Sequence, residues 1–212
     1  MNLRETLDRL RQDQAASPRA RAAIEATVDA LRRNGATDQA LGPGAAFPDF
    51  LLPDTEGRLV SRDDLLAGRA AVVTFFRGHW CPFCTATLGA LLRSLPDFEE
   101  AGAGLAAITP ETGGRARDAR YPASTSYRIL SDVDHGLAMA CGVAIRVPEP
   151  YRELLSAHGL DLGERQGNAA WFLPVPATFV LDREGCVRWS FVDVDFTRRA
   201  EPADILRAIR AV

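Results

Sequence analysis

The chain has 212 residues, of which 47% are hydrophobic and 25% are charged, and its formal net charge is −3 at pH 7. This is the composition of a soluble globular protein, long enough for one domain with a real core and an additional extension. The arginines are spread among acidic residues, so no nucleic-acid partner is expected. No apolar run reaches about 18 residues, so no membrane-spanning helix is expected.

The first residues are charged, and no apolar segment typical of a signal peptide follows them. We therefore expect a cytoplasmic protein. In that compartment a neighbouring pair of cysteines is normally kept reduced, so the pair would cycle between redox states rather than cross-link the fold.

Residues 1–42 are predicted to form a helical extension. Leu3, Leu7 and Leu10 share one face of a first helix. Ser17-Pro18 predicts the start of a second helix, because serine caps helices and proline is tolerated at their first position. The extension is expected to pack on the main domain or on a second subunit, so the prediction includes a homodimer.

Residues 43–212 are predicted to form one α/β domain, with an insertion at 146–174 that is polar and rich in proline and glycine. Apolar runs predict strands at 47–52, 59–60, 70–76, 105–109, 127–131, 177–181 and 186–192. Helical patterns follow Ser61 and Pro202 and cover 85–95 and 135–141. Strands that alternate with helices before a terminal hairpin predict a central mixed sheet between helical layers.

Two cysteines lie three positions apart where the predicted strand 70–76 leads into the predicted helix 85–95. A helix N-terminus carries free N–H groups and a partial positive charge, which stabilise a thiolate and lower its pKa. A thiolate is both nucleophile and leaving group, so Cys81 and Cys84 are predicted to be a redox pair. We expect a reversible disulfide between them, with Cys81 the more exposed.

Cysteine pairs at this spacing also occur in zinc sites, which need four ligands. Cys141 and Cys186 are isolated in the sequence, and the three histidines are scattered. No metal or other cofactor is therefore expected, and Cys141 and Cys186 are expected to stay free.

The segment Trp80-Cys81-Pro82-Phe83-Cys84 resembles a thioredoxin or glutaredoxin active site. Val175-Pro176-Ala177-Thr178 resembles the loop of that fold whose cis proline faces the cysteines. Segments between 44 and 210 resemble, in order and spacing, the peroxiredoxin-like AhpC/TSA (redoxin) family of the thioredoxin superfamily. The resemblance implies a thioredoxin-like three-layer α/β/α sandwich with a central mixed sheet, and a cis Val175–Pro176 bond beside the sulfurs.

The same resemblance shows which family positions are replaced. When Cys84 is placed on the family's peroxide-attacking cysteine, Cys81 replaces a threonine and Arg77 replaces a proline. Pro176 replaces the distant arginine that supports the thiolate. A proline has no N–H to donate to a peroxide, whereas an extended loop can pair with a substrate disulfide segment. These replacements favour disulfide exchange over peroxide reduction.

Three residues beside the cysteines are expected to support them. Arg77 and His79 would favour a thiolate by their charge, and Trp80 would pack as a lid. The buried acid that a thioredoxin carries on the preceding strand is replaced by Phe75. We therefore expect the pKa of Cys81 to lie below that of a free cysteine, and the pair to be more oxidising than a thioredoxin.

The leading hypothesis is a thiol–disulfide oxidoreductase in which Cys81 attacks a disulfide or a sulfenic acid and Cys84 resolves the product. The alternative is a peroxiredoxin-type thiol peroxidase in which a hydroperoxide oxidises Cys84 (or Cys81) and the other cysteine condenses with the sulfenic acid. In both enzymes the expected reductant is a thioredoxin- or glutathione-like thiol. A third hypothesis is a non-catalytic redox-sensing module, which would be favoured if residues 146–174 covered the sulfurs completely.

Overall fold

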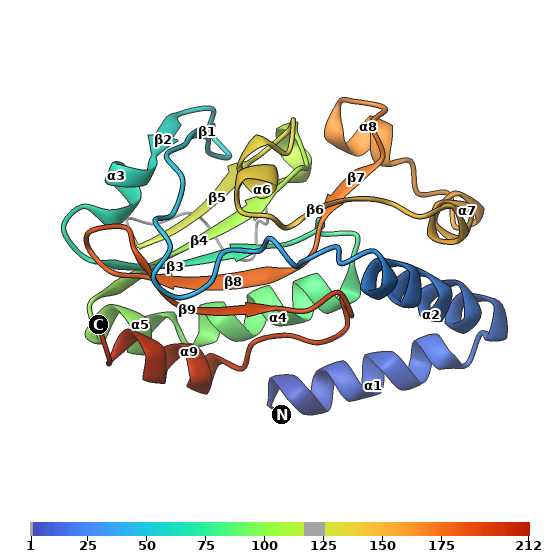
Figure 1. Ribbon diagram of the computed structural model, residues 1–212, viewed down its shortest axis with the longest axis horizontal. Coiled ribbons are helices and arrows are strands. Elements are labelled where there is room, and N and C mark those ends of the chain that lie inside the picture. The colour runs from blue at the N-terminus through green and yellow to red at the C-terminus, as the bar shows by residue number, and fades with distance from the viewer. Residues whose placement is uncertain (1, 117–125) are drawn as a thin grey trace.

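A five-stranded mixed sheet forms the centre of the computed structural model, which describes residues 2–116 and 126–212 (Figure 1). The strand order is β5-β4-β3-β8-β9, with β3 (Ala70–Phe75), β4 (Ala103–Thr109), β5 (Tyr127–Ser131), β8 (Ala177–Leu181) and β9 (Val187–Val192). Strands β3, β4 and β5 are parallel, and β8 is antiparallel to both β3 and β9. The predicted central mixed sheet is confirmed.

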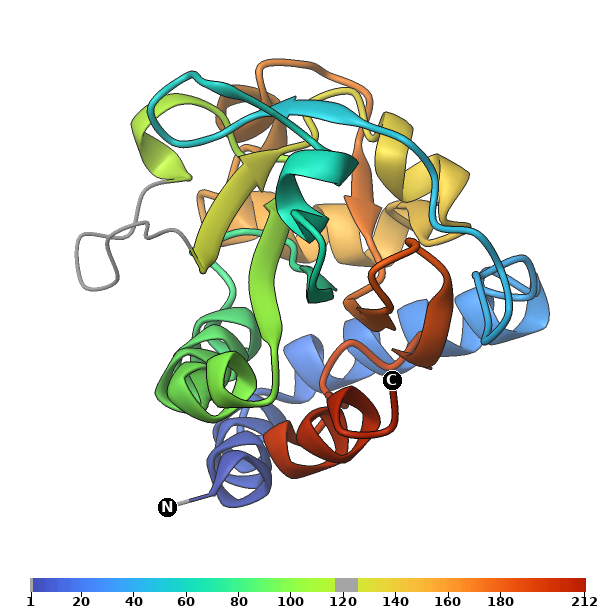
Figure 2. The ribbon, with the colours of Figure 1, turned by 90° about the vertical axis from the view of Figure 1, so that its left-hand side faces the viewer.

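Helices cover both faces of this sheet (Figures 1 and 2). One face carries α4 (Pro82–Arg93), α5 (Leu95–Glu100) and α9 (Pro202–Ile209), and the other carries α3 (Arg62–Leu66), α6 (Gly136–Ala140) and the hairpin of β1 (Leu51–Pro53) and β2 (Leu59–Ser61). Consecutive strand residues point to opposite faces. Val72 therefore joins the apolar cluster of α4 and α9, and Val73 joins the cluster of α3 and α6. The predicted three-layer α/β/α sandwich is confirmed.

The N-terminal segment forms α1 (Leu3–Ala15) and α2 (Pro18–Arg33). As predicted, Ser17 caps α2 and Pro18 occupies its first turn. Leu3 and Leu7 are buried in the same cluster as the helix α4, against which α1 packs. That residues 1–42 form a unit separate from 43–212 stays a prediction.

The segment 146–174 is more ordered than its composition indicated. It contains α7 (Glu149–Ala157) and α8 (Leu162–Gln166), and it is flanked by β6 (Ala144–Arg146) and β7 (Phe172–Pro174), which pair with each other. Tyr151, Leu154 and Leu155 form an apolar stripe on α7 that is buried against α2. The sequence analysis did not predict these helices, because it took the prolines and glycines as signs of an irregular insertion.

Helix α4 begins at Pro82, three residues before the predicted start at 85. Cys81 is its N-cap residue, so Cys84 lies within the first turn. Helix α4 ends at Arg93, and Pro96 lies in the first turn of the next helix, α5. Proline is tolerated in a first turn, where its missing N–H has no helical partner to lose.

The hairpin β1–β2 is fixed by a buried carboxylate at its turn. Asp54 Oδ1 accepts hydrogen bonds from the backbone N–H groups of Glu56 and Arg58 at 2.8 and 3.0 Å, and Oδ2 accepts one from Arg58 Nε at 2.9 Å. Burial disfavours the charge, but these bonds outweigh it and lower the pKa of Asp54 below 3.8.

The substitution Asp54→Ala is expected to lower the free energy of unfolding by about 1–3 kcal/mol at neutral pH. The native pKa lies below the unfolded value, so this stabilisation is present above the unfolded pKa and is lost as the pH falls through the native one. Chemical denaturation at neutral and acidic pH would measure both effects. Asp49→Ala is the control, because the Asp49 side chain is 84% exposed. Equal losses in the two variants would contradict the prediction.

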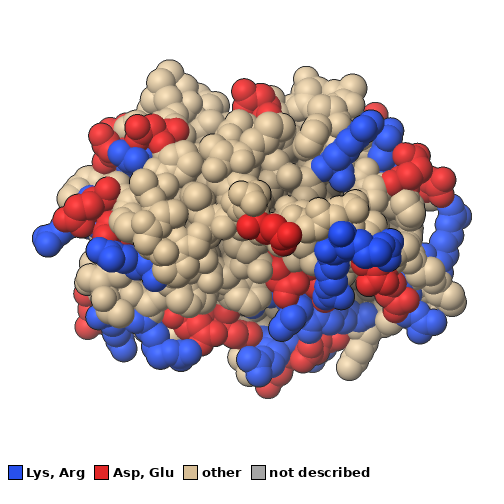
Figure 3. All heavy atoms as spheres, viewed as in Figure 1, with Lys and Arg blue, Asp and Glu red and all other residues tan. Residues whose placement is uncertain are grey.

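In the described part of the chain, no helix combines the length and the apolar character that crossing a membrane requires. On the face shown in Figure 3, arginines and acidic side chains lie next to one another.

Candidate active site

The loop between β3 and α4 places both cysteines at one end of the sheet. Cys81 N donates to Gly78 O at 3.2 Å, and Thr85 N donates to Cys81 O at 3.0 Å, which starts the helix. Gly78 has a φ of 140°, and a side chain there would lie 2.6 Å from Trp80 Nε1 and 2.7 Å from Glu111 Cδ. Only glycine fits this close turn.

Both cysteines are buried thiols. Cys81 is 0% exposed and Cys84 is 1% exposed, so the prediction that Cys81 is the more exposed is wrong. The reason is the cover over Cys81, which includes Arg77 and the aromatic rings around it. The two thiols are unlinked here, and a reversible disulfide between them stays a prediction.

Arg77 is a buried charge in direct contact with Cys81. Its Nη2 donates to Cys81 Sγ at 2.9 Å, and its Nη1 donates to the Tyr151 hydroxyl at 2.8 Å. The guanidinium carbon lies 3.8 Å from the ring centroid of Phe196 and 5.2 Å from that of Trp80. The structure thus brings two predicted site residues, Arg77 and Trp80, together with Cys81.

Arg199 reaches the second sulfur from the chain that follows β9. Its Nη2 lies 3.6 Å from Cys84 Sγ, within hydrogen-bonding distance of a sulfur acceptor. Each cysteine therefore has its own guanidinium, Arg77 at Cys81 and Arg199 at Cys84.

These contacts favour a thiolate on Cys84 rather than on Cys81. Burial disfavours a charged Cys84, but the hydrogen bond from Cys81 and the charges of Arg199 and Arg77 outweigh it and hold the pKa of Cys84 well below its usual range. Burial, followed by the hydrogen bond to Cys84, raises the pKa of Cys81 well above its usual range. The prediction of a lowered pKa for Cys81 is therefore wrong, because its burial and its hydrogen bond to Cys84 outweigh the charge of Arg77.

Val175 and Pro176 lie where the sequence placed them, but not in the predicted conformation. Pro176 lines a cavity of about 10 Å³ together with Cys84, Thr178 and Arg199. The Val175–Pro176 bond is trans, so the prediction of a cis bond is wrong. The chain runs extended from β7 into β8, with Val175 N donating to Val143 O at 2.7 Å, and a trans bond, the intrinsically preferred form, continues this path.

His79 is turned toward a carboxylate. Its backbone N donates to Glu111 Oε2 at 2.8 Å, and its Nδ1 lies 3.3 Å from the same oxygen. Arg165 of α8 donates to the other oxygen of Glu111 at 3.2 Å. His79 is therefore held by Glu111 at the rim of the loop.

The sequence analysis missed three residues of this site, Glu111, Tyr151 and Arg199. A signal existed for Glu111, which follows β4, because the carboxyl ends of the parallel strands β3 and β4 share one edge of the sheet. Tyr151 contacts Arg77, which lies 74 residues away in the sequence, and Arg199 contacts Cys84, which lies 115 residues away. No local pattern marks them.

The other two cysteines lie elsewhere. Cys141 is buried on the opposite face of the sheet, and burial raises its pKa to about 12. Cys186 lies just before β9. Neither is placed to exchange with Cys81 or Cys84.

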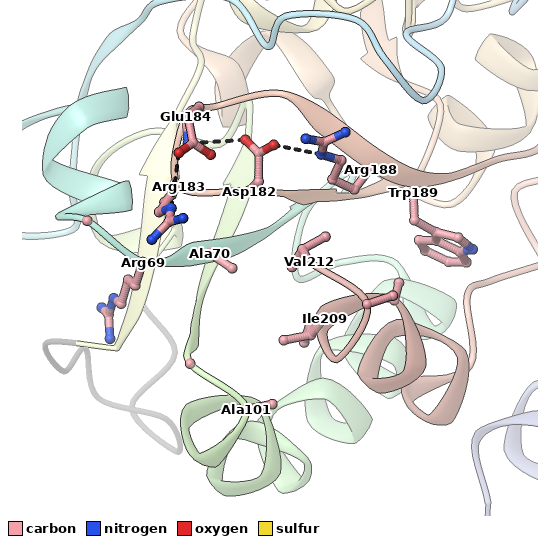
Figure 4. Close-up of a pocket in the computed structure, with 14 residues that line it drawn as sticks. Arg69, Ala70, Ala101, Asp182, Arg183, Glu184, Arg188, Trp189, Ile209 and Val212 are labelled. Carbon is pink, nitrogen blue, oxygen red and sulfur yellow. Dashed lines mark hydrogen bonds and ion pairs between the residues drawn. The ribbon is translucent and has the colours of Figure 1, made fainter.

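A second pocket lies at the far end of β3 (Figure 4). Four of its charged side chains form two ion pairs, since Arg188 Nε lies 2.6 Å from Asp182 Oδ2 and Arg183 Nε lies 3.0 Å from Glu184 Oε1. It contains no cysteine, so it is not part of the redox site.

Comparison with known proteins gives concordant matches. The model of the AhpC/TSA family matches residues 43–190. A putative peroxiredoxin of Mycobacterium tuberculosis is 31% identical over 147 residues, which cover 68% of this chain and 81% of that protein. The chloroplastic peroxiredoxin Q of Oryza sativa subsp. japonica is 27% identical over 172 residues, or 81% of this chain and 67% of that protein.

Solved structures show the same fold. Peroxiredoxin 6 of Arenicola marina matches with a TM-score of 0.62 and 20% identity, over 80% of this chain and 72% of that one. The yeast mitochondrial 1-Cys peroxiredoxin, studied for thiol resolving via glutathione/thioredoxin systems, matches with a TM-score of 0.58 and 19% identity, over 81% and 76%. These matches confirm the resemblance on which the thioredoxin-like fold was predicted. Because the family model matches well over half of this chain, the chain belongs to the AhpC/TSA family and is a thiol-dependent oxidoreductase.

Proposed function

We propose that this enzyme is a thiol peroxidase in which Cys84 attacks a hydroperoxide and Cys81 then forms a disulfide with it. The observation that carries the proposal is the position of Cys84, which lies in the first turn of α4 with Arg199 Nη2 3.6 Å from its sulfur. The Cys81 hydrogen bond and the charges of Arg199 and Arg77 lower the pKa of Cys84, which is consistent with this assignment. The thiolate is the nucleophilic form of cysteine. The proposal reverses the roles in the leading sequence hypothesis, where Cys81 attacks.

The first step uses the proton that the two sulfurs share. The Cys84 thiolate attacks the terminal oxygen of the hydroperoxide, so an S–O bond forms and the O–O bond breaks. The alkoxide that leaves takes the proton of the Cys81 thiol and departs as an alcohol, or as water when the substrate is hydrogen peroxide. Cys81 is then a thiolate facing Arg77 Nη2, which lies 2.9 Å from its sulfur.

The second step closes the disulfide. The Cys81 thiolate attacks the sulfur of the Cys84 sulfenic acid, an S–S bond forms, and hydroxide leaves and is protonated by solvent. A thiol reductant of the thioredoxin or glutathione type then returns two electrons and two protons. Such systems are the ones studied with the yeast relative.

The two other hypotheses lose support. Disulfide exchange by Cys81 was predicted with Cys81 as the more exposed sulfur, and Cys81 is 0% exposed. A small hydroperoxide needs much less access than a protein disulfide. The non-catalytic module required complete cover by residues 146–174, and Tyr151 of this segment does reach Arg77 above Cys81. Membership in a family of oxidoreductases nevertheless favours catalysis. A cytoplasmic location and a homodimer stay predictions.

Chemical trapping tests the assignment. In the Cys81→Ser variant, one equivalent of hydrogen peroxide is expected to leave a sulfenic acid on Cys84, detected by mass spectrometry after reaction with a dimedone-type probe. In the natural protein the same treatment is expected to link Cys81 with Cys84 and to leave Cys141 and Cys186 unmodified. A sulfenic acid formed on Cys81 of the Cys84→Ser variant at the natural rate would refute the proposal.

A further inference from the structure

The segment 193–199 supplies residues to both sulfurs. It connects β9 with α9, and it lies beyond residue 190, where the match to the family model ends. Arg199 lies 3.6 Å from Cys84 Sγ, and the ring of Phe196 lies 3.8 Å from the guanidinium carbon of Arg77. The position of this segment, named here the arginine loop, therefore affects both arginines at the sulfurs.

The arginine loop is held internally by a turn at Asp195. Asp195 Oδ1 accepts hydrogen bonds from Thr197 N at 3.0 Å and from Thr197 Oγ1 at 2.7 Å. Short turns of this kind fix local shape, but they do not fix the place of a loop on the protein. The apolar side chains of Val194 and Phe196 hold the loop by packing, and Thr197 has a polar contact from outside the loop.

Arg11 of the N-terminal extension provides that contact. Its Nε donates to Thr197 Oγ1 at 2.9 Å, and its Nη2 donates to Thr197 O at 2.8 Å, across 186 residues of chain. Two parallel donors on a planar guanidinium set orientation as well as distance, which a single hydrogen bond does not do.

Helix α1, which carries Arg11, is held in place by apolar packing. Leu3 and Leu7 are 3% and 2% exposed and belong to the apolar cluster that contains Cys84 and Leu88 of α4. Helix α1 also packs directly against α4. The extension therefore connects the helix that carries Cys84 to the loop that carries Arg199.

We propose that Arg11 is a positioning residue that holds the arginine loop through Thr197, so that Arg199 faces the Cys84 thiolate and the N-terminal extension forms part of the active site. The inference deepens the proposed peroxidase and rests on it only for the role of Cys84 as the attacking residue. The interaction between two charges weakens as their separation grows, so a loosened loop would stabilise the thiolate less.

The test is the ionisation of Cys84, measured without any oxidant. Ultraviolet thiolate absorbance is titrated with pH in the Cys81→Ser background, and the signal of the Cys81→Ser/Cys84→Ser protein is subtracted. Arg11→Met, which removes the donors and keeps an unbranched side chain, is expected to raise the midpoint of Cys84 by about half a pH unit, or about 3-fold in ionisation constant. Arg9→Met, an exposed position on the same helix, is expected to leave the midpoint unchanged.

A double-mutant cycle separates positioning from a general loosening of the fold. If Arg11 acts through Arg199, Arg11→Met is expected to have no effect on the midpoint once Arg199→Met is present. Thr197→Val removes the hydrogen bond from Arg11 Nε to Thr197 Oγ1 and keeps the one from Arg11 Nη2 to Thr197 O, so it is expected to shift the midpoint in the same direction by a smaller amount, even if Arg11→Met folds poorly. The proposal is overturned if neither Arg11→Met nor Thr197→Val moves the midpoint, or if the shift persists without Arg199. A peroxide assay that fails while the midpoint still shifts would refute the peroxidase and leave this inference standing.

Discussion

Replacing Cys84 with serine is expected to lower the rate of hydroperoxide consumption by about 10³-fold or more. A serine hydroxyl stays protonated at neutral pH, so the site would lose the anionic nucleophile that Arg199 faces. The rate would be measured in steady state with a thiol reductant in excess. Cys186→Ser is the matched control, because Cys186 lies just before β9 and is expected to leave the rate unchanged.

Cys81→Ser should behave differently from Cys84→Ser. Its first oxidation is expected to proceed, with a burst of peroxide consumption equal to one equivalent of enzyme, and turnover through the intramolecular disulfide is then expected to stop. A Cys84→Ser protein that keeps the burst, together with a Cys81→Ser protein that loses it, would show that the two roles are reversed.

Replacing Arg77 with methionine is expected to slow formation of the Cys81–Cys84 disulfide by about 10- to 100-fold. The Cys81 thiolate would lose the donor now 2.9 Å from its sulfur. Hydrogen bonds to charged groups contribute about 1.5–3 kcal/mol, and about 1.4 kcal/mol corresponds to a tenfold change in rate. Stopped-flow fluorescence is the measurement, because Trp80 lies beside Arg77 and is expected to report the closing disulfide.

Two controls separate this effect from damage to the fold. Arg77→Met leaves the buried Tyr151 hydroxyl without its partner and is expected to cost about 1–3 kcal/mol of unfolding free energy, so folding must be verified. Arg188→Met removes a half-exposed arginine at the far pocket and is expected to leave disulfide formation unchanged. If folded Arg77→Met formed the disulfide as fast as the protein of natural sequence, the role given to Arg77 would be contradicted.

Local sequence patterns predicted the framework of this protein well. The cap at Ser17, the proline at position 18 and the junction before Cys81 depend on neighbours a few residues away, and the structure confirms them. The strands predicted at 47–52 and 59–60 overlap β1 and β2, which pair as a hairpin, a local structure.

Local sequence patterns could not predict which cysteine has the lowered pKa. Reasoning from the helix N-terminus and from nearby charges assigned the thiolate to Cys81, but burial and the shared proton depend on tertiary packing. Arg199 occupies no position that the family pattern marks. Arg199 therefore places a guanidinium at Cys84, beside the Pro176 that replaces the family's distant arginine.

The Arg77 side chain has a further consequence for the balance of charge in the interior. In the reduced state that we propose, the sulfurs carry one negative charge, with Arg77 Nη2 at Cys81 and Arg199 Nη2 at Cys84. Formation of the disulfide removes that charge, and Arg77, which is 4% exposed, is left without a counter-ion and with little access to water. An uncompensated buried charge is costly. Oxidation therefore makes the interior less favourable in free energy than it is in the reduced protein. Arg77 thus favours reduction of the disulfide back to the two thiols.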